Sequence, residues 1–322
     1  MGDPAGVGPE VCLQLLANPE VAEFAIPVVF GDAQILRRCA ESTGLPIPDR
    51  VVVEENWENE RGAIGDPCIL DLPKFDREGF EPGSVSAATG AAAYHYVLKS
   101  IDAAMASEVA AVATAPLNKE ALRAAGVTYP GHTEIFADKT GADRACMLQY
   151  SEEVRASFVT VHVGYHEVPD LITTERILEV IELTADAMKR IRGGDPKLGI
   201  LGLNPHAGEH GLFGNREEER FIIPAMELAR ERGIEVEGPL PPDTAFLPEK
   251  RRSTDAFVCM YHDQGHIPLK ALAFDNAVNT TLGLPIIRTS VDHGTACDIA
   301  WQGKANGGSL FEAVKLAAQL AG

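Results

Sequence analysis

The sequence lacks the features that would place it in a membrane or in an oxidising compartment. No stretch approaches the ~18 consecutive apolar residues of a membrane-spanning helix, and no basic start leads into an apolar run as in a signal peptide. The six cysteines lie far apart and form no C-x-x-C pair, which is typical of reduced thiols rather than of a disulfide scaffold or a zinc ribbon. We therefore expect a soluble, cytoplasmic protein.

Positive charge is scarce in this chain. Its 28 lysines and arginines face 47 aspartates and glutamates, which gives a net charge of −19. Surfaces that bind nucleic acid or anionic membranes need clustered cations, so we expect neither partner. A small anionic substrate remains compatible with this balance, provided that its pocket is built from a few well-placed cations.

What the chain does contain is an alternation of short apolar runs and longer amphipathic ones. Buried strands are predicted over residues 25–32, 109–116, 157–165, 197–206 and 255–263. Helices are predicted over 87–106, 173–192 and 216–232. Such alternation is typical of a mostly parallel sheet covered by helices on both faces. We predict an α/β fold of two α/β/α domains with a cleft between them.

Two crossings between these domains are predicted. The helix at 87–106 and a loop at 127–136 place the first crossing near residue 125, and the chain returns within 280–295. The first domain is expected to comprise 1–125 plus 290–322. The second, 126–289, is expected to carry most of the metal and substrate residues.

Six of the nine histidines form three pairs at a spacing of four residues. The pairs are His162/His166, His206/His210 and His262/His266. Glycine and proline near the pairs argue against helices that would present both members to one metal. Each pair instead follows a predicted strand, and ligands of α/β sheets bind beyond the carboxyl ends of strands. One imidazole from each pair would form an open metal site. A single histidine is more often structural, and the spacing does not choose within a pair.

Two glycine-rich stretches are candidates for binding a cofactor. "GDPAGVGPE" (2–10) resembles a phosphate-cradling loop but lacks the G-x-G-x-x-G and G-K-[ST] patterns, so a tight turn before the first helix explains it equally well. "VDHGTACDIAWQGKANGGSL" (291–310) offers backbone amides and small side chains that could admit an adenine and a ribose closely, although an ordinary turn–helix–turn has similar support. Its candidate contacts are His293, Gly294, Thr295, Asp298 and Asn306.

Six motifs, in order from residue 2 to about 310, together resemble the 4-hydroxythreonine-4-phosphate dehydrogenase family. They are "GDPAGVGPE", "GHTEIFA", "GLNPHAGEHGLFGNREEE", "GPLPPDTAF", "MYHDQGHIPLK" and "VNTTLGLPIIRTSVDHGTACDIA". The last also resembles the adenine-binding loop of isopropylmalate and isocitrate dehydrogenases, the structural relatives of the family. The resemblance therefore covers essentially the whole chain.

The resemblance implies NAD-dependent oxidation, with NADP as the alternative cofactor, and decarboxylation of a short phosphorylated hydroxy acid. It also implies one divalent ion per site (Zn, Co, Mn, Ni or Mg) and a homodimer whose active site lies at the subunit interface. The implied metal ligands are His162, His206 and His262, with His266 in a supporting role. The implied substrate contacts are His132, Thr133, Lys270, Asn279 and Arg288. Asp243 or Lys270 would relay the proton.

Two departures from the family pattern bear on the substrate and the cofactor. The segment "VGYHEV" after His162 is unlike the pyridoxine-pathway enzymes and is similar to the branch that oxidises threonate or erythronate 4-phosphate. Trp301 stands where the related adenine loops often carry glycine. The alternatives are a cis-dihydrodiol carboxylate dehydrogenase, a metallohydrolase that would leave "DHGTACDIA" unused, and a catalytically silent binding protein.

Overall fold

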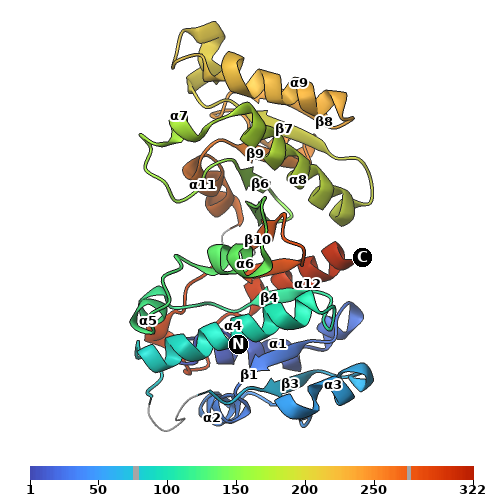
Figure 1. Cartoon of the computed structure of the whole chain (residues 1–322), viewed down its shortest axis with the longest axis vertical. Coiled ribbons are helices and arrows are strands. Elements are labelled where there is room, and N and C mark those ends of the chain that lie inside the picture. The colour runs from blue at the N-terminus through green and yellow to red at the C-terminus, as the bar shows by residue number, and fades with distance from the viewer. Residues whose placement is uncertain (75–79, 274–276) are drawn as a thin grey trace. The chain divides into compact units, whose positions relative to one another are not determined.

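The computed structural model describes residues 1–74, 80–273 and 277–322 and divides the chain into two compact units (Figure 1). Unit 1 comprises Met1–Ala142 and Pro285–Ala321, and unit 2 comprises Asp143–Leu284 with Gly322. The chain leaves unit 1 after residue 142 rather than near 125, because helix α6 (His132–Thr140) packs against helix α4 of the same unit. The segment 127–136, predicted as a loop, thus contains the first turn of a helix.

Unit 1 is built on two sets of parallel strands. Its three-stranded sheet has the order β1 (Val28–Gly31), β3 (Cys68–Asp71), β2 (Val51–Val53), and β4 (Val112–Thr114) pairs with β11 (Arg288–Val291). The helices are α1 (Gly8–Ala17), α2 (Ala33–Thr43), α3 (Trp57–Glu60), α4 (Ala87–Met105), α5 (Lys119–Ala124), α6 and α12 (Gly308–Ala321). A core of fully buried aliphatic side chains from α1 and α2 packs on this framework.

Helix α2 shows how local sequence starts and ends an element of unit 1. Asp32 precedes the helix, and its Oδ1 accepts hydrogen bonds from the backbone amides of Gln34 (2.9 Å) and Ile35 (3.2 Å). An aspartate at this position satisfies amides that have no partner within the helix. Gly44 ends the helix with a φ of 72°, a left-handed conformation that glycine adopts without a steric penalty.

Unit 2 contains a mostly parallel sheet. Its strand order is β10 (Val278–Leu282), β5 (Cys146–Tyr150), β6 (Arg155–Phe158), β9 (Ala256–Cys259), β7 (Lys197–Leu201), β8 (Glu235–Leu240). Strand β5 is antiparallel to both neighbours, and the rest of the sheet from β6 to β8 is parallel. The helices are α7 (Val168–Leu171), α8 (Thr174–Arg192), α9 (Ile223–Glu231), α10 (Pro248–Arg252) and α11 (His262–Ala273). The predicted α/β class is confirmed.

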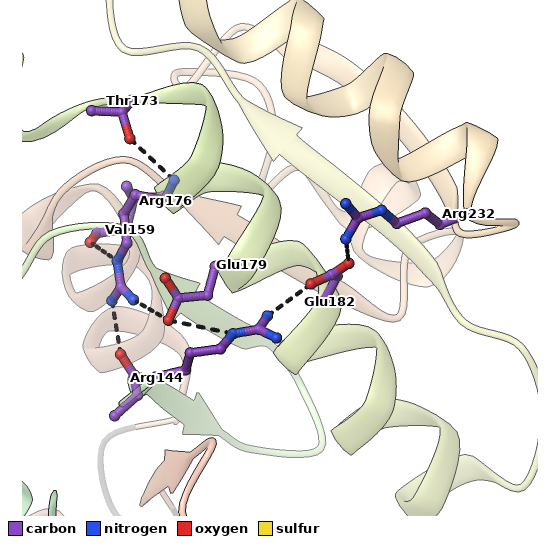
Figure 2. A network of polar contacts seen from close by, with 8 residues as sticks. Arg144, Val159, Thr173, Arg176, Glu179, Glu182 and Arg232 are labelled. Atoms are coloured by element: carbon purple, nitrogen blue, oxygen red, sulfur yellow. Dashed lines mark hydrogen bonds and ion pairs between the residues drawn. The ribbon is translucent and has the colours of Figure 1, made fainter. Parts of the chain in front are cut away.

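Helix α8 is tied to the sheet of unit 2 by a network of arginines and glutamates (Figure 2). The guanidinium of Arg176 donates to the backbone oxygen of Val159, directly after β6, at 3.1 Å, and also to that of Ala145 at 2.9 Å. Glu179 accepts a further bond from the same guanidinium at 3.0 Å. The ion pair between Arg176 and Glu179 is partly buried, and the hydrogen bond from Arg176 to Val159 holds the backbone directly after β6.

No helix in the described part of the chain is long and apolar enough to cross a membrane.

Candidate functional site

Strands β6 and β9 bring two of the predicted metal ligands together at one edge of the unit 2 sheet. The strands are parallel neighbours, with Phe158 aligned to Cys259, so their carboxyl ends coincide. His162 follows β6 in a turn with a φ of 51°, and His262 follows β9. Their ring centroids are 5.7 Å apart. The structure therefore places these two imidazoles side by side, beyond the ends of neighbouring strands.

A carboxylate and a tyrosine hold the ring of His262. Its Nδ1 lies 2.7 Å from Oδ1 of Asp263, and the hydroxyl of Tyr165 donates to the other carboxylate oxygen. These hydrogen bonds, first that from Tyr165, lower the pKa of Asp263. An ionised partner at Nδ1 keeps the proton on that nitrogen and leaves Nε2 as an electron-pair donor, as is common for metal-bound histidines.

His266 supports His262 rather than competing with it. The two rings stack at a centroid distance of 3.8 Å, and the other face of His266 stacks on Phe158 at 4.5 Å. Its Nδ1 lies 3.0 Å from the backbone oxygen of His262. Burial, followed by the charge of His262, lowers the pKa of His266 to about 4, so this ring is neutral and donates to that carbonyl.

The pair His262/His266 lies on a helix, so the prediction against a helix was wrong at this position. Local propensity is overridden here because Gly265 allows α11 to approach the sheet. A Cβ at residue 265 would lie 2.7 Å from a ring carbon of Phe158 and 2.9 Å from the sulfur of Cys259. A side chain at residue 265 would therefore collide with Phe158 and Cys259. This explains why glycine occupies the position, although glycine disfavours helices.

His206 lies in a turn shaped by two buried glutamates. The backbone of residues 206–210 is left-handed throughout. Asn204 joins the turn to both acids: its amide donates to Glu217 at 2.8 Å and to Glu218 at 3.0 Å. A Cβ on Gly208 would lie 2.5 Å from a carboxylate oxygen of Glu218. The glutamates of "GNREEE" therefore shape the loop that presents His206, a role the sequence analysis missed.

The three predicted metal ligands are not gathered into one cluster within the described residues of a single chain. Within residues 1–74, 80–273 and 277–322, no three His, Cys, Asp or Glu side chains are grouped so that they could hold a metal ion. His162 and His262 are neighbours, whereas the ring contact described for His206 is with Phe213, at 6.0 Å. The donor set fits a divalent ion in its chemistry, because Asp263 sets the tautomer of His262 and neutral imidazoles are good ligands.

Unit 1 contains a buried cation among the predicted substrate contacts. Arg288 is 2% exposed, donates to Oγ1 of Thr114 at 3.0 Å and lies 5.4 Å from the centroid of the Phe136 ring. Burial lowers its pKa to about 9, which leaves it charged near neutral pH. An arginine fixed in this way suits bidentate recognition of a phosphate or carboxylate.

His132 and Thr133 begin helix α6 in the same unit. The Nε2 atom of His132 is buried and has no hydrogen-bond partner within the described residues. Burial, and then the charge of Arg288, lowers the pKa of His132 well below its usual value, so the ring is neutral. A neutral imidazole with an unused nitrogen beside a guanidinium can hydrogen-bond a ligand oxygen.

The remaining predicted substrate and catalytic residues belong to unit 2. Lys270 is exposed on α11, Asp243 is exposed in the turn after β8, and Asn279 lies on β10 opposite Gln149. The predicted second domain was expected to hold most site residues. Unit 2 holds most of the predicted metal and substrate residues, namely His162, His206, His262, Lys270 and Asn279. His132, Thr133 and Arg288 lie in unit 1, because α6 and β11 belong to that unit.

The candidate cofactor residues follow β11 in unit 1. His293 places its Nδ1 2.9 Å from the backbone oxygen of Gly294, and Thr295 is buried. Asp298 is exposed in the short 3-10 turn Cys297–Ile299. The side chain of Asn306 accepts from the amide of Gly308 at 2.9 Å, at the start of α12. We refer to residues 293–306 below as the 293–306 loop.

Known proteins are similar to this chain over nearly its whole length. The family model described as "Pyridoxal phosphate biosynthetic protein PdxA" matches residues 23–317. D-threonate 4-phosphate dehydrogenase of Pectobacterium atrosepticum is 44% identical, over 100% of this chain and 98% of that protein. 4-Hydroxythreonine-4-phosphate dehydrogenase of Desulforapulum autotrophicum is 42% identical, over 99% and 93%. The crystal structure of 4-hydroxythreonine-4-phosphate dehydrogenase from Klebsiella pneumoniae matches with a TM-score of 0.87 and 42% identity, over 100% and 96%.

Proposed function

Because the chain belongs to the family of the pyridoxal phosphate biosynthetic protein PdxA, we propose that it oxidises and decarboxylates D-threonate 4-phosphate with NAD. It is a dehydrogenase of this family and uses a nicotinamide cofactor. The choice of substrate rests on the segment after His162. Tyr165, from the "VGYHEV" stretch that departs from the pyridoxine-pathway pattern, reaches the carboxylate that orients His262.

Two cations are proposed for the acidic groups of the substrate. The guanidinium of Arg288 is buried and fixed, which favours a planar, bidentate contact with a carboxylate or phosphate. Lys270 is an exposed point charge on a flexible stem and tolerates less exact geometry. His132 and Thr133 add neutral hydrogen-bonding groups beside Arg288, and Asn279 adds an amide in unit 2. In an overall acidic chain, such local cations provide the attraction that the net charge of −19 lacks.

We propose that His162, His206 and His262 hold one divalent ion and that two copies of the chain share each site. The scattered position of these ligands among the described residues of one chain, and the family resemblance, support this homodimer. A bound ion would act as a Lewis acid toward the substrate hydroxyl and the neighbouring carboxylate. Imidazole ligands favour zinc, cobalt, manganese or nickel, whereas magnesium would need added oxygen ligands from substrate and water.

The reaction requires two proton transfers, one from the substrate to a residue of the chain and one from a residue to the substrate. Oxidation moves a hydride from the carbon that bears the secondary hydroxyl to the nicotinamide, while the hydroxyl proton passes to a base. The β-keto acid then loses CO2, and the resulting enolate takes up a proton. Asp243 and Lys270 are the residues proposed for these transfers, since both present exposed titratable side chains in unit 2.

Formation of the reduced nicotinamide, followed by absorbance, tests this function. The purified protein would receive D-threonate 4-phosphate, D-erythronate 4-phosphate or 4-hydroxythreonine 4-phosphate, each with added divalent metal and with a chelator. Metal-dependent turnover that is fastest with D-threonate 4-phosphate is expected. Faster turnover of 4-hydroxythreonine 4-phosphate would overturn the substrate assignment. Silence with all three, but turnover of a cis-dihydrodiol carboxylate, would move the protein to that activity.

A further inference from the structure

The glycine-rich turn at residues 2–10 does not cradle phosphate, because its amides are already bonded within the protein. The amide of Asp3 donates to the oxygen of Pro116 at 2.9 Å, and that of Ala5 donates to the Asp3 side chain at 2.9 Å. The amide of Gly6 donates to the oxygen of Asp3 at 3.1 Å. A phosphate-binding loop needs free amides that point toward the ligand. Of the two interpretations left open by the sequence, the structure favours the tight turn.

The same turn is instead packed against the 293–306 loop of unit 1. The amide of Val7 donates to the backbone oxygen of Thr295 at 2.9 Å. A Cβ on Gly6 would lie 2.8 Å from that oxygen and 2.9 Å from the Cβ of Thr295. Since any side chain at residue 6 would separate the two segments, the close approach itself requires glycine.

Helix α1, which starts in this turn, holds both backbone polar groups of one loop residue, Ala305. Oε1 of Glu10 accepts from the amide of Ala305 at 2.8 Å, and the side-chain amide of Gln14 donates to the oxygen of the same residue at 2.9 Å. Glu10 and Gln14 are four residues apart and therefore share a helix face. Glu10 is fully buried. The hydrogen bond is partly buried and accepted by a carboxylate, and bonds to carboxylates are among the stronger ones.

Trp301 anchors the middle of the loop in a conformation that bulky residues rarely adopt. Its φ is 60°, in the left-handed region, which explains why related loops often carry glycine at this point. The side chain is 5% exposed, and its indole Nε1 donates to the oxygen of Pro4 at 3.2 Å. The ring of Phe80 meets it edge-on at 5.8 Å, and the guanidinium of Arg38 lies 5.5 Å from its centroid. These contacts offset the backbone strain.

We propose that residues 2–14 form a clamp that shapes the 293–306 loop before the cofactor binds. In this view Glu10, Gln14 and Trp301 are positioning residues for the nicotinamide cofactor, although none of them needs to touch it. A loop that is already ordered loses less conformational freedom on binding, so the clamp raises cofactor affinity. The inference rests on the proposed function, which assigns the cofactor to this loop.

Titration of the enzyme with NADH, followed by fluorescence, tests the clamp. Gln14→Ala and Trp301→Gly are expected to raise the Kd of NADH and the KM of NAD by about tenfold, with kcat and the substrate KM nearly unchanged. Glu10→Ala should act in the same direction. Glu10→Gln keeps an oxygen that can accept from Ala305 and should restore most of the affinity. Gln34→Ala, on the exposed face of α2, is the matched control and should change nothing.

Hydrogen exchange separates positioning from a general loss of structure. In the absence of cofactor, the variants should exchange faster at the amides of residues 293–306, while the core strands of unit 1 keep their protection. Unchanged NADH affinity in folded Gln14→Ala and Trp301→Gly would overturn the clamp, and so would faster exchange throughout unit 1. Failure of the cofactor assignment looks different, because the wild-type protein itself would then neither bind NADH nor reduce NAD, and a different substrate would leave NADH binding and its response to the variants unchanged.

Discussion

The two units hold their candidate residues in different ways. In unit 1 the groups are buried and fixed: Arg288 is 2% exposed and bonded to Thr114, and the 293–306 loop is held by α1. In unit 2, His162 and His206 lie on exposed turns with left-handed backbone, whereas His262 is hydrogen-bonded to Asp263 and stacked on His266. Unit 1 therefore presents its candidate residues in a fixed arrangement, while unit 2 presents two of its three candidate imidazoles on exposed turns.

The largest effect is expected from substitution of His262, the predicted metal ligand that Asp263 and Tyr165 orient. His262→Ala should abolish both activity and metal retention, because no other imidazole on α11 can take its position. His266→Ala removes only the stacking support and should leave a measurable part of each, with losses of about 10–100-fold. Metal content after dialysis and kcat/KM would be measured for both proteins. Equal losses in the two variants would refute the division of roles within this pair.

Substitution of Arg288 tests the role of the buried candidate residues of unit 1. Arg288→Met removes the buried cation but keeps much of its apolar volume, so we expect kcat/KM to fall by about a hundredfold or more through loss of charge-assisted bonds to the substrate. The thermal midpoint should stay constant or rise, since replacing a buried charge by an apolar side chain is often neutral or stabilising. Loss of activity together with loss of folding would show that Arg288 is structural.

The comparison between the units could be anticipated only in part. Strand and helix alternation predicts the α/β class, and the ends of β6 and β9 were expected to present histidines. Helix α11 was not expected, because Gly265 breaks a helix by local propensity and is accommodated only through its contact with Phe158. The clamp on Ala305 joins residues about 290 positions apart, and no local pattern encodes such a contact.

The position of the boundary between the units could not be predicted from local sequence either. A proline and a glycine near residue 130 indicate a loop, and the first crossing was placed near residue 125 for that reason. Helix α6 packs against α4 and thereby stays in unit 1, carrying His132 and Thr133 with it. Tyr165 was also missed, since nothing in "VGYHEV" indicates that its hydroxyl reaches an aspartate 98 positions later.

Substitutions of Asp263 and Tyr165 test how much each hydrogen bond contributes to the orientation of His262. Asp263→Asn removes the negative charge that keeps the His262 tautomer, so metal affinity should fall by about tenfold or more. Tyr165→Phe removes one hydrogen bond to an ionised aspartate and should cost less, a few-fold at most. Competition with a chromophoric chelator measures both affinities. A larger effect for Tyr165→Phe than for Asp263→Asn would contradict the proposed order of support.

The smallest effect concerns stability and the neutral ring of His132. Its pKa is lowered well below 6.5 by burial and by Arg288, so at pH values under 6.5 the unfolded chain binds a proton that the folded chain does not. Stability must then rise with pH up to about 6.5 and be lost as the pH falls below it. Between pH 6.5 and 5.5 this group alone should lower the free energy of unfolding.

His132→Asn should flatten this part of the stability curve while leaving the region above pH 7 parallel to that of the wild type. Urea unfolding at several pH values measures the difference. An unchanged slope between pH 5 and 6.5 would mean that His132 titrates normally in the folded protein, and hence that water or motion reaches its ring nitrogen. In that case His132 would be accessible to solvent, as His162 and His206 of unit 2 are. The contrast between the two units would then rest on Arg288 and the 293–306 loop alone.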